Sequence, residues 1–237
     1  MTTGIELGHA LITMIEPDPE TILGYHRWYE SDHFLAGVLV GPGAFAGQRW
    51  VAPKDLKALR RPTDSIVAQP VGDGSFITAY WIEKDKLTDH WDWAFPEAAK
   101  FAAVGRMDPR RHHVSTAYYD VTAVTARDGD SAPPELAIHR AYPAVVVVWA
   151  DTGTVDPADL AVGAVDQVVT FRPTPLPDPL PPMPGAVMSE PDRDVELHLC
   201  FVDDTTGDWA TQIDVDALLV APFIPTIPGT TTYLDQL

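Results

Sequence analysis

Residues 7–38 read LGHALITMIEPDPETILGYHRWYESDHFLAGV, and this stretch decides how the fold begins. Its first part, from Leu7 to Ile15, is a mostly apolar run of strand length. Asp18-Pro19 after it indicates a helix start, because aspartate caps helices and proline suits their first turn. The helix is expected to run from Pro19 to Val38, and Gly41-Pro42-Gly43 stops it.

The pattern continues to about residue 124. Further strands are expected over 44–51, 75–83 and 113–124, a second long helix over 87–104, and a short helical insertion over 53–59. The order strand, helix, strand, strand, helix, strand is that of a ferredoxin-like unit.

A polar linker is expected over 128–142, and a degenerate repeat of the same pattern follows it. Its expected elements are strands over 144–150, 167–172, 195–202 and 219–227, a short helix over 156–162 and a helix over 208–218. One ferredoxin-like unit leaves a sheet face bare, and two units can cover each other by closing a barrel. We therefore predict an α+β fold in which two tandem ferredoxin-like halves, 1–127 and 143–237, form an intramolecular dimeric α+β barrel.

The segment from Pro173 to Pro191 holds 8 prolines in 19 residues. Proline removes a backbone donor and fixes its own backbone angle, so this segment is expected to be neither helix nor central strand. We expect an extended surface loop that shapes the mouth of a pocket.

Composition excludes several classes of function. The net charge of −18 disfavours nucleic acid and anionic membranes as partners. The single cysteine, Cys200, rules out an internal disulfide and a cysteine-based zinc site. The N-terminus lacks the basic and apolar regions of a signal peptide, so a cytoplasmic location is expected. Phosphate-binding and nucleophile-elbow motifs are not found either.

The first helix carries the densest candidate site. Ile22, His26, Tyr29 and His33 follow at spacings of 4, 3 and 4, which places them on one face of an α-helix. Histidine is the side chain best suited to move a proton near neutral pH. Two alternatives stay open, namely histidines bonded to backbone carbonyls in the core, and a metal site, although no dense ligand motif supports a metal.

Several motifs together resemble a known family. They are Trp28 to His33 (WYESDH), Gly41-Pro42-Gly43 and Gln48-Arg49-Trp50, with Met14 to Pro17 upstream and Tyr80 to Glu83 downstream. Over residues 7–124 the chain resembles EthD-like members of the dimeric α+β barrel superfamily. The resemblance implies a pocket between sheet and helices for a small aromatic or polyketide-like compound, and a functional role for His33. The usual proline after that histidine is replaced by Phe34 to Gly37, so the helix is expected to continue further.

Other residues are candidates for contacts with a ligand. Arg49 would hold a negative group, although an ion pair to Asp32 or Glu83 is an equal alternative. His113 would be a second proton carrier or an anion partner, or else part of a solvated strand start. Aromatic walls are expected from Trp28, Trp50, Tyr80, Trp81 and Trp91, and for Trp91 core packing is the alternative.

Three functions follow from these residues. The first is a cofactor-independent lyase or isomerase in which His33 carries the proton while His26 and Tyr29 orient it. The second is an oxygenase on the same fold, either cofactor-free or with a haem held by His33 or His113. The third is a non-catalytic binding or structural module. In each case one pocket per chain is expected, in a monomer that is its own pseudo-dimer or that associates further.

Overall fold

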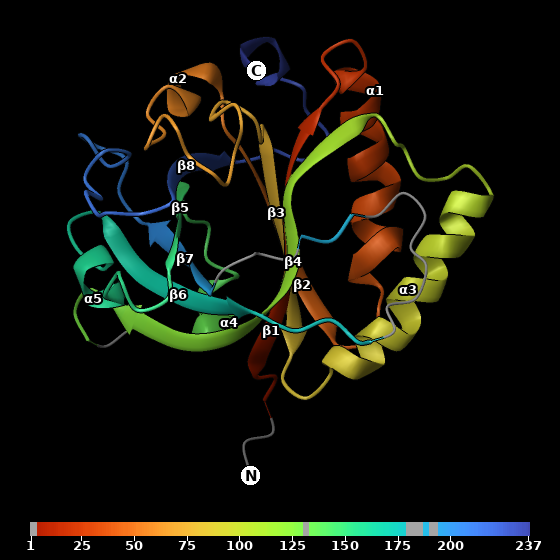
Figure 1. Ribbon diagram of the computed structural model, residues 1–237, viewed down its shortest axis with the longest axis horizontal. Helices are drawn as coiled ribbons and strands as arrows, with labels where there is room; N and C mark the ends of the chain where they lie inside the picture. Colours follow the sequence, from red (N-terminus) through yellow and green to blue (C-terminus); the bar gives the residue numbers. More distant parts are fainter. Residues whose placement is uncertain (1–3, 130–132, 179–186, 190–193) are drawn as a thin grey trace.

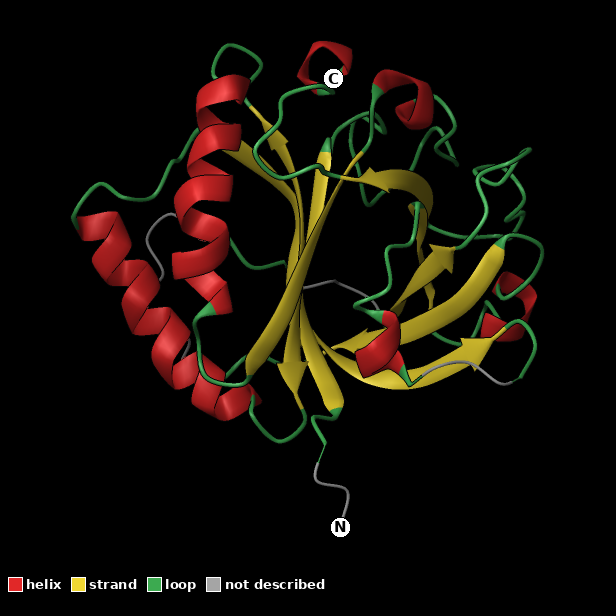
Figure 2. Ribbon diagram, turned by 180° about the vertical axis from the view of Figure 1, so that it is seen from behind, coloured by secondary structure: helices red, strands yellow, loops and turns green. Residues whose placement is uncertain are grey.

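The computed structural model describes residues 4–129, 133–178, 187–189 and 194–237. It is a mixed α+β fold in which eight antiparallel strands close a barrel, with two long helices on one side (Figures 1 and 2). The strands are β1 (Leu7–Pro17), β2 (Ala44–Val51), β3 (Phe76–Glu83), β4 (Arg111–Ala126), β5 (Ala144–Asp151), β6 (Val165–Pro173), β7 (Val195–Val202) and β8 (Leu219–Pro225). The helices are α1 (Ile22–Trp28), the π-helix η1 (Tyr29–Leu39), α2 (Lys54–Lys57), α3 (Leu87–Ala103), α4 (Pro134–Ala137), α5 (Pro157–Leu160) and the short 3-10 helix η2 (Leu234–Gln236).

The strand order repeats between the two halves of the chain. Around the barrel it is β1-β3-β2-β8-β5-β7-β6-β4. The first four strands are therefore neighbours as β4-β1-β3-β2. The last four are neighbours as β8-β5-β7-β6, which is the same order when β5 to β8 are counted as the first to fourth strands of their half. The two seams between the halves differ, because β4 pairs with β6 from Tyr119–Pro173 to Ala126–Gln167, while β2 pairs with β8 only at Trp50–Pro225 and Val51–Ile224.

All eight expected strands are present, and so are both long helices of the first half. The expected helix over 208–218 is wrong, because this part of the chain is a turn followed by an irregular segment. The reason lies in the sequence, where Ile213, Val215 and Ala217 alternate with aspartates. Such a period of two suits an extended chain with one face on a sheet, and these three side chains do pack against the second half of the barrel.

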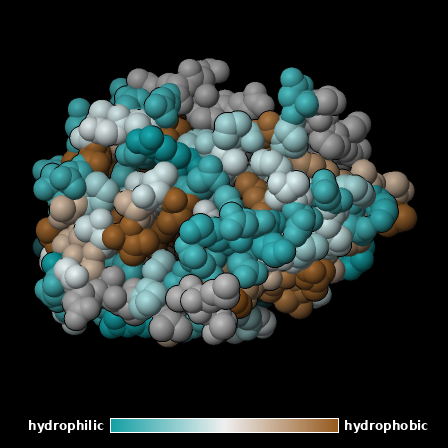
Figure 3. All heavy atoms as spheres, turned by 90° about the horizontal axis from the view of Figure 1, so that it is seen from below, coloured by the Kyte–Doolittle hydropathy of each residue, from teal (hydrophilic) through white to brown (hydrophobic). Residues whose placement is uncertain are grey.

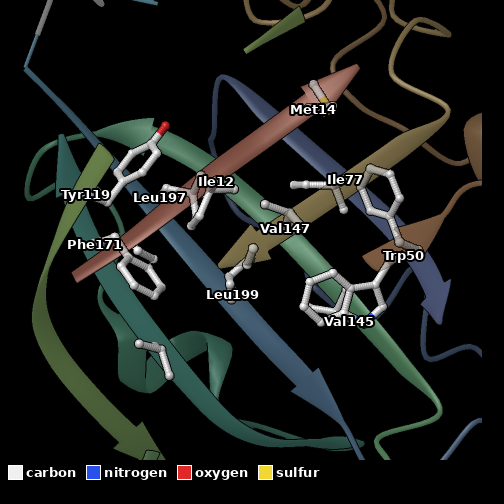
Figure 4. Packing of buried hydrophobic residues seen from close by; sticks show 14 of the residues in the cluster. Ile12, Met14, Trp50, Ile77, Tyr119, Val145, Val147, Phe171, Leu197 and Leu199 are labelled. Atoms are coloured by element: carbon white, nitrogen blue, oxygen red, sulfur yellow. The ribbon is translucent and has the colours of Figure 1, made fainter. Parts of the chain in front are cut away.

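The barrel interior is filled with side chains from both halves (Figure 4). Strand residues alternate between the two faces of a sheet, so every second residue of each strand enters this core. The labelled members come from the seven strands β1 to β7: Ile12, Met14, Trp50, Ile77, Tyr119, Val145, Val147, Phe171, Leu197 and Leu199. The centre of the barrel is therefore packed, and space for a ligand has to lie elsewhere.

The outer face of the sheet is covered differently in the two halves. Helices α1, η1 and α3 lie over the first half (Figure 2). In the second half, α5 and the irregular segment before β8 pack directly on the strands. The end of the molecule near the N-terminus shows hydrophobic residues in separate patches among hydrophilic ones (Figure 3). Within the described residues, each helix is too short or too polar to cross a bilayer.

Candidate functional site

A cavity of about 100 Å³ lies between the first-half sheet and its helices. Its floor is the outer face of β1, β3 and β4, including Thr13, Tyr80 and Thr116. Its roof comes from η1 and α3, and Val187 and Met188 add to its wall. Those two residues belong to the described part of the proline-rich segment, so this segment does border the cavity, as the sequence predicted.

The π-helix η1 places His33 and Tyr29 on the cavity. A π-helix bonds each N–H to the carbonyl five residues back, is rare, and occurs mostly near functional sites. The bond from Val40 N to Leu35 O at 3.1 Å shows this spacing where η1 ends. The wider turn begins at Tyr29 and rotates all later side chains relative to those of α1. For this reason His26, which an unbroken α-helix would place on the same face as His33, does not line the cavity.

His33 is held by ring contacts. Its imidazole stacks on Trp28 at 4.7 Å between ring centroids and meets the edge of Tyr29 at 5.3 Å. A β-carbon at Gly37 would lie 2.5 Å from His33 Nδ1, so glycine is the residue that fits beside this ring. Burial, and then the nearby positive charge of Arg111, lower the pKa of His33 to about 3. The imidazole is therefore neutral at physiological pH and has a lone pair to accept a proton.

A hydrogen-bonded chain crosses the cavity floor. Arg111 Nε donates to His113 Nε2 at 3.0 Å, which leaves the ring proton of His113 on Nδ1. His113 Nδ1 then donates to Thr116 Oγ1 at 2.8 Å, and the hydroxyls of Thr116 and Thr13 are 2.6 Å apart. Burial, followed by Arg111, lowers the pKa of His113 to about 4, so this chain is neutral apart from its arginine.

Two further polar atoms at the cavity lack a partner among the described residues. They are Tyr25 Oη and His90 Nε2, one a potential donor and the other an acceptor. His90 donates from Nδ1 to Pro42 O at 3.1 Å, which fixes Nε2 as the acceptor. Native proteins rarely leave buried polar atoms unpaired, and where they do a ligand or ordered water is a common explanation. Burial also lowers the pKa of His90 and raises that of Tyr25, so both side chains are neutral.

The charge around this cavity is unusual for so acidic a chain. Its described lining includes Arg111 and no aspartate or glutamate, although the net charge of the protein is −18. Arg111 is oriented by His113 and by the carbonyl oxygen of Asp108. A negative charge that develops on a ligand in this cavity would therefore meet the guanidinium of Arg111.

The structure places His26 and Arg49 on the far side of the Tyr29 ring. Arg49 Nη1 donates to His26 Nδ1 at 3.0 Å, and His26 Nε2 donates to Thr230 O at 2.9 Å. Both nitrogens of His26 are thus engaged, which matches the alternative of a core histidine bonded to a backbone carbonyl. The guanidinium carbon of Arg49 lies 4.3 Å from the ring centre of Tyr29 and 4.0 Å from that of Phe76.

The five aromatic residues that the sequence predicted as walls of a ligand site also lie in different places in the structure. Tyr80 lines the cavity and bonds Tyr29 Oη at 2.8 Å. Trp50 and Trp81 face the barrel interior instead, because neighbouring strand residues point to opposite faces. Trp28 supports His33 from behind, and Trp91 packs on Phe95 and Tyr118. Of this group only Tyr80 lines the cavity at His33.

The residues present do not fit a haem. A cavity of about 100 Å³ has no room for a macrocycle as large as haem. Both ring nitrogens of His113 are hydrogen-bonded, so neither is free to bind an iron, and a haem held by His33 would have to lie in that same small space. Among the described residues there is also no cluster of three histidine, cysteine or acidic side chains that would hold a metal ion.

Four polar residues of this site were not among the predicted ones. Thr13, Thr116 and His90 belong to elements that the sequence did predict. Arg111 lies two residues before His113, where the predicted strand begins. Threonine facing outward on two paired strands, Thr13 beside Thr116, was the available signal. It becomes readable only once the pairing register is known.

Comparison with known proteins gives only remote similarities. No family model and no curated protein matches the chain. Among solved structures it is similar to an anthrone oxidase-like protein, with a TM-score of 0.47, 9% identity, and coverage of 94% of this chain and 92% of the other. A protein named for chlorite dismutase gives a TM-score of 0.46, 8% identity, and coverage of 94% and 96%. Neither likeness indicates a function at this level, and the resemblance to EthD-like proteins stays a prediction.

Proposed function

We propose that the chain is a small-molecule enzyme of lyase or isomerase type, in which His33 moves a proton to or from a ligand in the helix–sheet cavity. The observation that carries this proposal is that a neutral histidine, His33, and the guanidinium of Arg111 line the same cavity. Removing a proton next to a carbonyl creates an enolate, whose negative charge needs such a cation.

The low pKa of His33 is compatible with this role. Burial and Arg111 depress it when no anion is near. A developing enolate beside the ring would raise it again, because an opposite charge favours the protonated imidazole. The protonated imidazole of His33 and the negative enolate would then arise together as an ion pair. Arg111 would stabilise the enolate. Thr116, which accepts from His113, would donate to Thr13, and the Thr13 hydroxyl would donate to the enolate oxygen.

The ligand class follows from the rest of the lining. Leu11, Ile15, Phe95 and Met188 are apolar, and Tyr118 adds a ring face. Of the aromatic or polyketide-like class, a small compound with an acidic C–H beside a carbonyl suits such a wall and a cavity of about 100 Å³. The expected role of His113 is to position the threonine hydroxyls. We assign no proton transfer to His26, since both of its nitrogens are engaged.

Exchange of C–H hydrogen for deuterium in D2O tests this directly. Cyclic 1,3-diketones and hydroxynaphthalenones are suitable probes, with the exchange followed by NMR. The wild-type protein is expected to accelerate the exchange of at least one of them, and His33→Ala to lose about 10²–10⁴-fold of that acceleration. The exposed neighbour His112 gives the matched control, His112→Ala. Exchange that persists in His33→Ala, or that no probe shows, contradicts the proposal.

A cofactor-free oxygenase is the second candidate, and the apolar lining favours it. Such an enzyme would begin with the same proton transfer, after which the enolate reacts with O2. An oxygen electrode separates the two functions, because only the oxygenase consumes O2 together with the probe. A lyase or isomerase leaves the O2 concentration unchanged.

We also propose that the chain divides into halves at residues 1–127 and 143–237, joined by 128–142, each with ferredoxin-like strand order. The repeated order of strands around the barrel supports this. A single polypeptide then closes the barrel that two subunits would otherwise form, and its working site lies in the first half. A cytoplasmic location remains part of this proposal.

A further inference from the structure

A second and larger cavity, of about 510 Å³, lies at the short seam between β2 and β8. These two strands pair only at Trp50–Pro225 and Val51–Ile224, so the earlier part of β2 has no strand partner on that side among the described residues. Residues 140–142, which follow α4, and the side chains of η1 border the opening instead. This cavity is separate from the one that His33 lines.

The walls of the seam cavity are largely aromatic. Phe34, Trp50, Tyr142 and Phe201 contribute rings, and the prolines 225 and 228 add flat apolar surface. Rings from several elements around one space favour a planar apolar ligand body. The polar lining comes from a few residues, chiefly Glu30, Gln48 and Arg49, with Arg140 at the edge.

Arg49 is the most informative of these polar residues, because it is 7% exposed and incompletely paired. Its Nη1 donates to the neutral His26, and the nearest carboxylate oxygen, Oε1 of Glu30, is 3.7 Å from Nη1, beyond hydrogen-bond length. Its Nε and Nη2 are buried without a partner among the described residues. A buried guanidinium edge without an acceptor is costly unless a ligand supplies one.

The same edge of other arginines in this chain binds carboxylates. Arg172 donates from Nε and Nη2 to a single oxygen, Oε1 of Glu196, at 3.1 and 2.9 Å. Arg106 uses these two atoms on Asp32, and Arg110 uses them on Asp108. This two-pronged geometry is what arginine offers to planar carboxylates. The unpartnered edge of Arg49 therefore has the form of a carboxylate site.

Two unpartnered acceptors complement that edge. Gln48 donates from Nε2 to Ile138 O at 2.6 Å, which leaves Gln48 Oε1 as a buried acceptor. Glu30 accepts from Gly229 N at 2.9 Å through Oε2, and its Oε1 has no hydrogen-bond partner among the described residues. A ligand that satisfies both kinds of atom needs an acceptor group for Arg49 and a hydroxyl donor for Gln48 or Glu30.

We propose that the seam cavity binds a small hydroxylated aromatic carboxylate. Its carboxylate is the missing partner of Arg49, its hydroxyl donates to Gln48 or Glu30, and its ring lies among Trp50, Tyr142 and Phe201. This site is independent of the proton transfer proposed at His33.

Isothermal titration with 2-, 3- and 4-hydroxybenzoate tests the proposal, and phenol and benzyl alcohol serve as probes without the carboxylate. Wild-type protein is expected to bind at least one hydroxybenzoate and to bind the uncharged probes at least about tenfold more weakly. Arg49→Lys keeps the charge but loses the two-pronged edge, and should raise Kd at least about tenfold. Arg172→Lys, which alters an arginine outside the cavity, is the matched control.

Ala141→Trp keeps the test decisive if Arg49→Lys fails to fold. Ala141 is exposed at the rim of the cavity, so a tryptophan there blocks the opening from outside. It should abolish hydroxybenzoate binding while leaving deuterium exchange at the His33 cavity unchanged. Absence of binding by all three hydroxybenzoates overturns the proposal, and so does binding that Ala141→Trp leaves intact or that the uncharged probes match.

Discussion

The two halves of the barrel share their strand order and differ in what covers their outer face. In the first half, helices α1, η1 and α3 lie over polar strand residues such as Thr13 and Thr116, and a cavity remains beneath them. In the second half, the corresponding face carries Val146, Val148 and Cys200, and the segment before β8 packs on it directly. The shared strand order therefore accounts for the barrel, whereas the elements that cover the outer face and the residues that point outward determine where a ligand fits.

The second half keeps one trace of the same polar pattern. His198 Nδ1 and Thr170 Oγ1 are 3.0 Å apart, and both residues are buried on the outer face of the sheet. The pair resembles that of His113 and Thr116, but neither residue lines the cavity at His33 or the seam cavity. This histidine therefore offers an internal comparison for the chemistry of the first half.

The largest expected contrast is between these two histidines. His113→Ala removes the donor that orients Thr116, and should slow deuterium exchange about 10²-fold. His198→Ala should leave the exchange rate unchanged, while lowering the unfolding temperature through a buried vacancy. NMR exchange rates and thermal unfolding of both variants measure the difference. Equal loss of rate in the two variants would mean that the first half is not the site.

A smaller loss of rate is expected from Gly37→Ala. The added β-carbon would lie 2.5 Å from His33 Nδ1 and has to displace the ring, so we expect about a tenfold loss of exchange. Gly72, where a β-carbon meets nothing within 4 Å, gives the control Gly72→Ala. If Gly37→Ala retains the full rate, the position of His33 in the structure does not matter for the reaction.

The two half-buried histidines of the cavity, His33 and His113, also predict how the stability of the protein depends on pH. The folded-state pKa values of His33 and His113, about 3 and about 4, lie below the ordinary 6.5, so protonation favours the unfolded chain. Their stabilising contribution is complete above pH 6.5 and is lost as the pH falls towards 4. The double variant His33→Asn, His113→Asn should therefore show a flatter unfolding temperature over this range than wild type. His112→Asn is the control, and identical curves for all three proteins would contradict the assignment.

The smallest effect concerns stability within the first half. Tyr29→Phe leaves the buried Tyr80 hydroxyl without the partner that it now has at 2.8 Å, and should cost about 1–3 kcal/mol. Tyr142→Phe is the comparison near the second half, where Asp166 would keep its ion pair with Arg140 at 2.7 Å. Urea unfolding should show the larger loss for Tyr29→Phe. A reversed order would mean that the Tyr29–Tyr80 bond contributes little.

Much of the fold could be predicted from local patterns, and the failures have physical causes. The strands and long helices follow from runs and periodicities in the sequence, and all of them are found. The prediction of a helix over 208–218 was wrong because its apolar residues recur every second position, which is the spacing of an extended chain and not of a helix. The prediction that His26 and His33 share a face assumed an unbroken α-helix, and the wider turns of η1 separate them.

By itself the sequence determined the number and order of strands, the two long helices, and the presence of histidine and tyrosine on the first of them. These features depend on neighbouring residues and on the spacing of hydrophobic residues, both of which can be read from a single sequence. Only the tertiary structure decided that Thr13 meets Thr116, that Arg111 fixes the ring proton of His113, and that Arg49 belongs to a different cavity from His33. Those contacts join residues from separate elements, so they depend on strand register and helix phase, which short stretches of sequence do not specify.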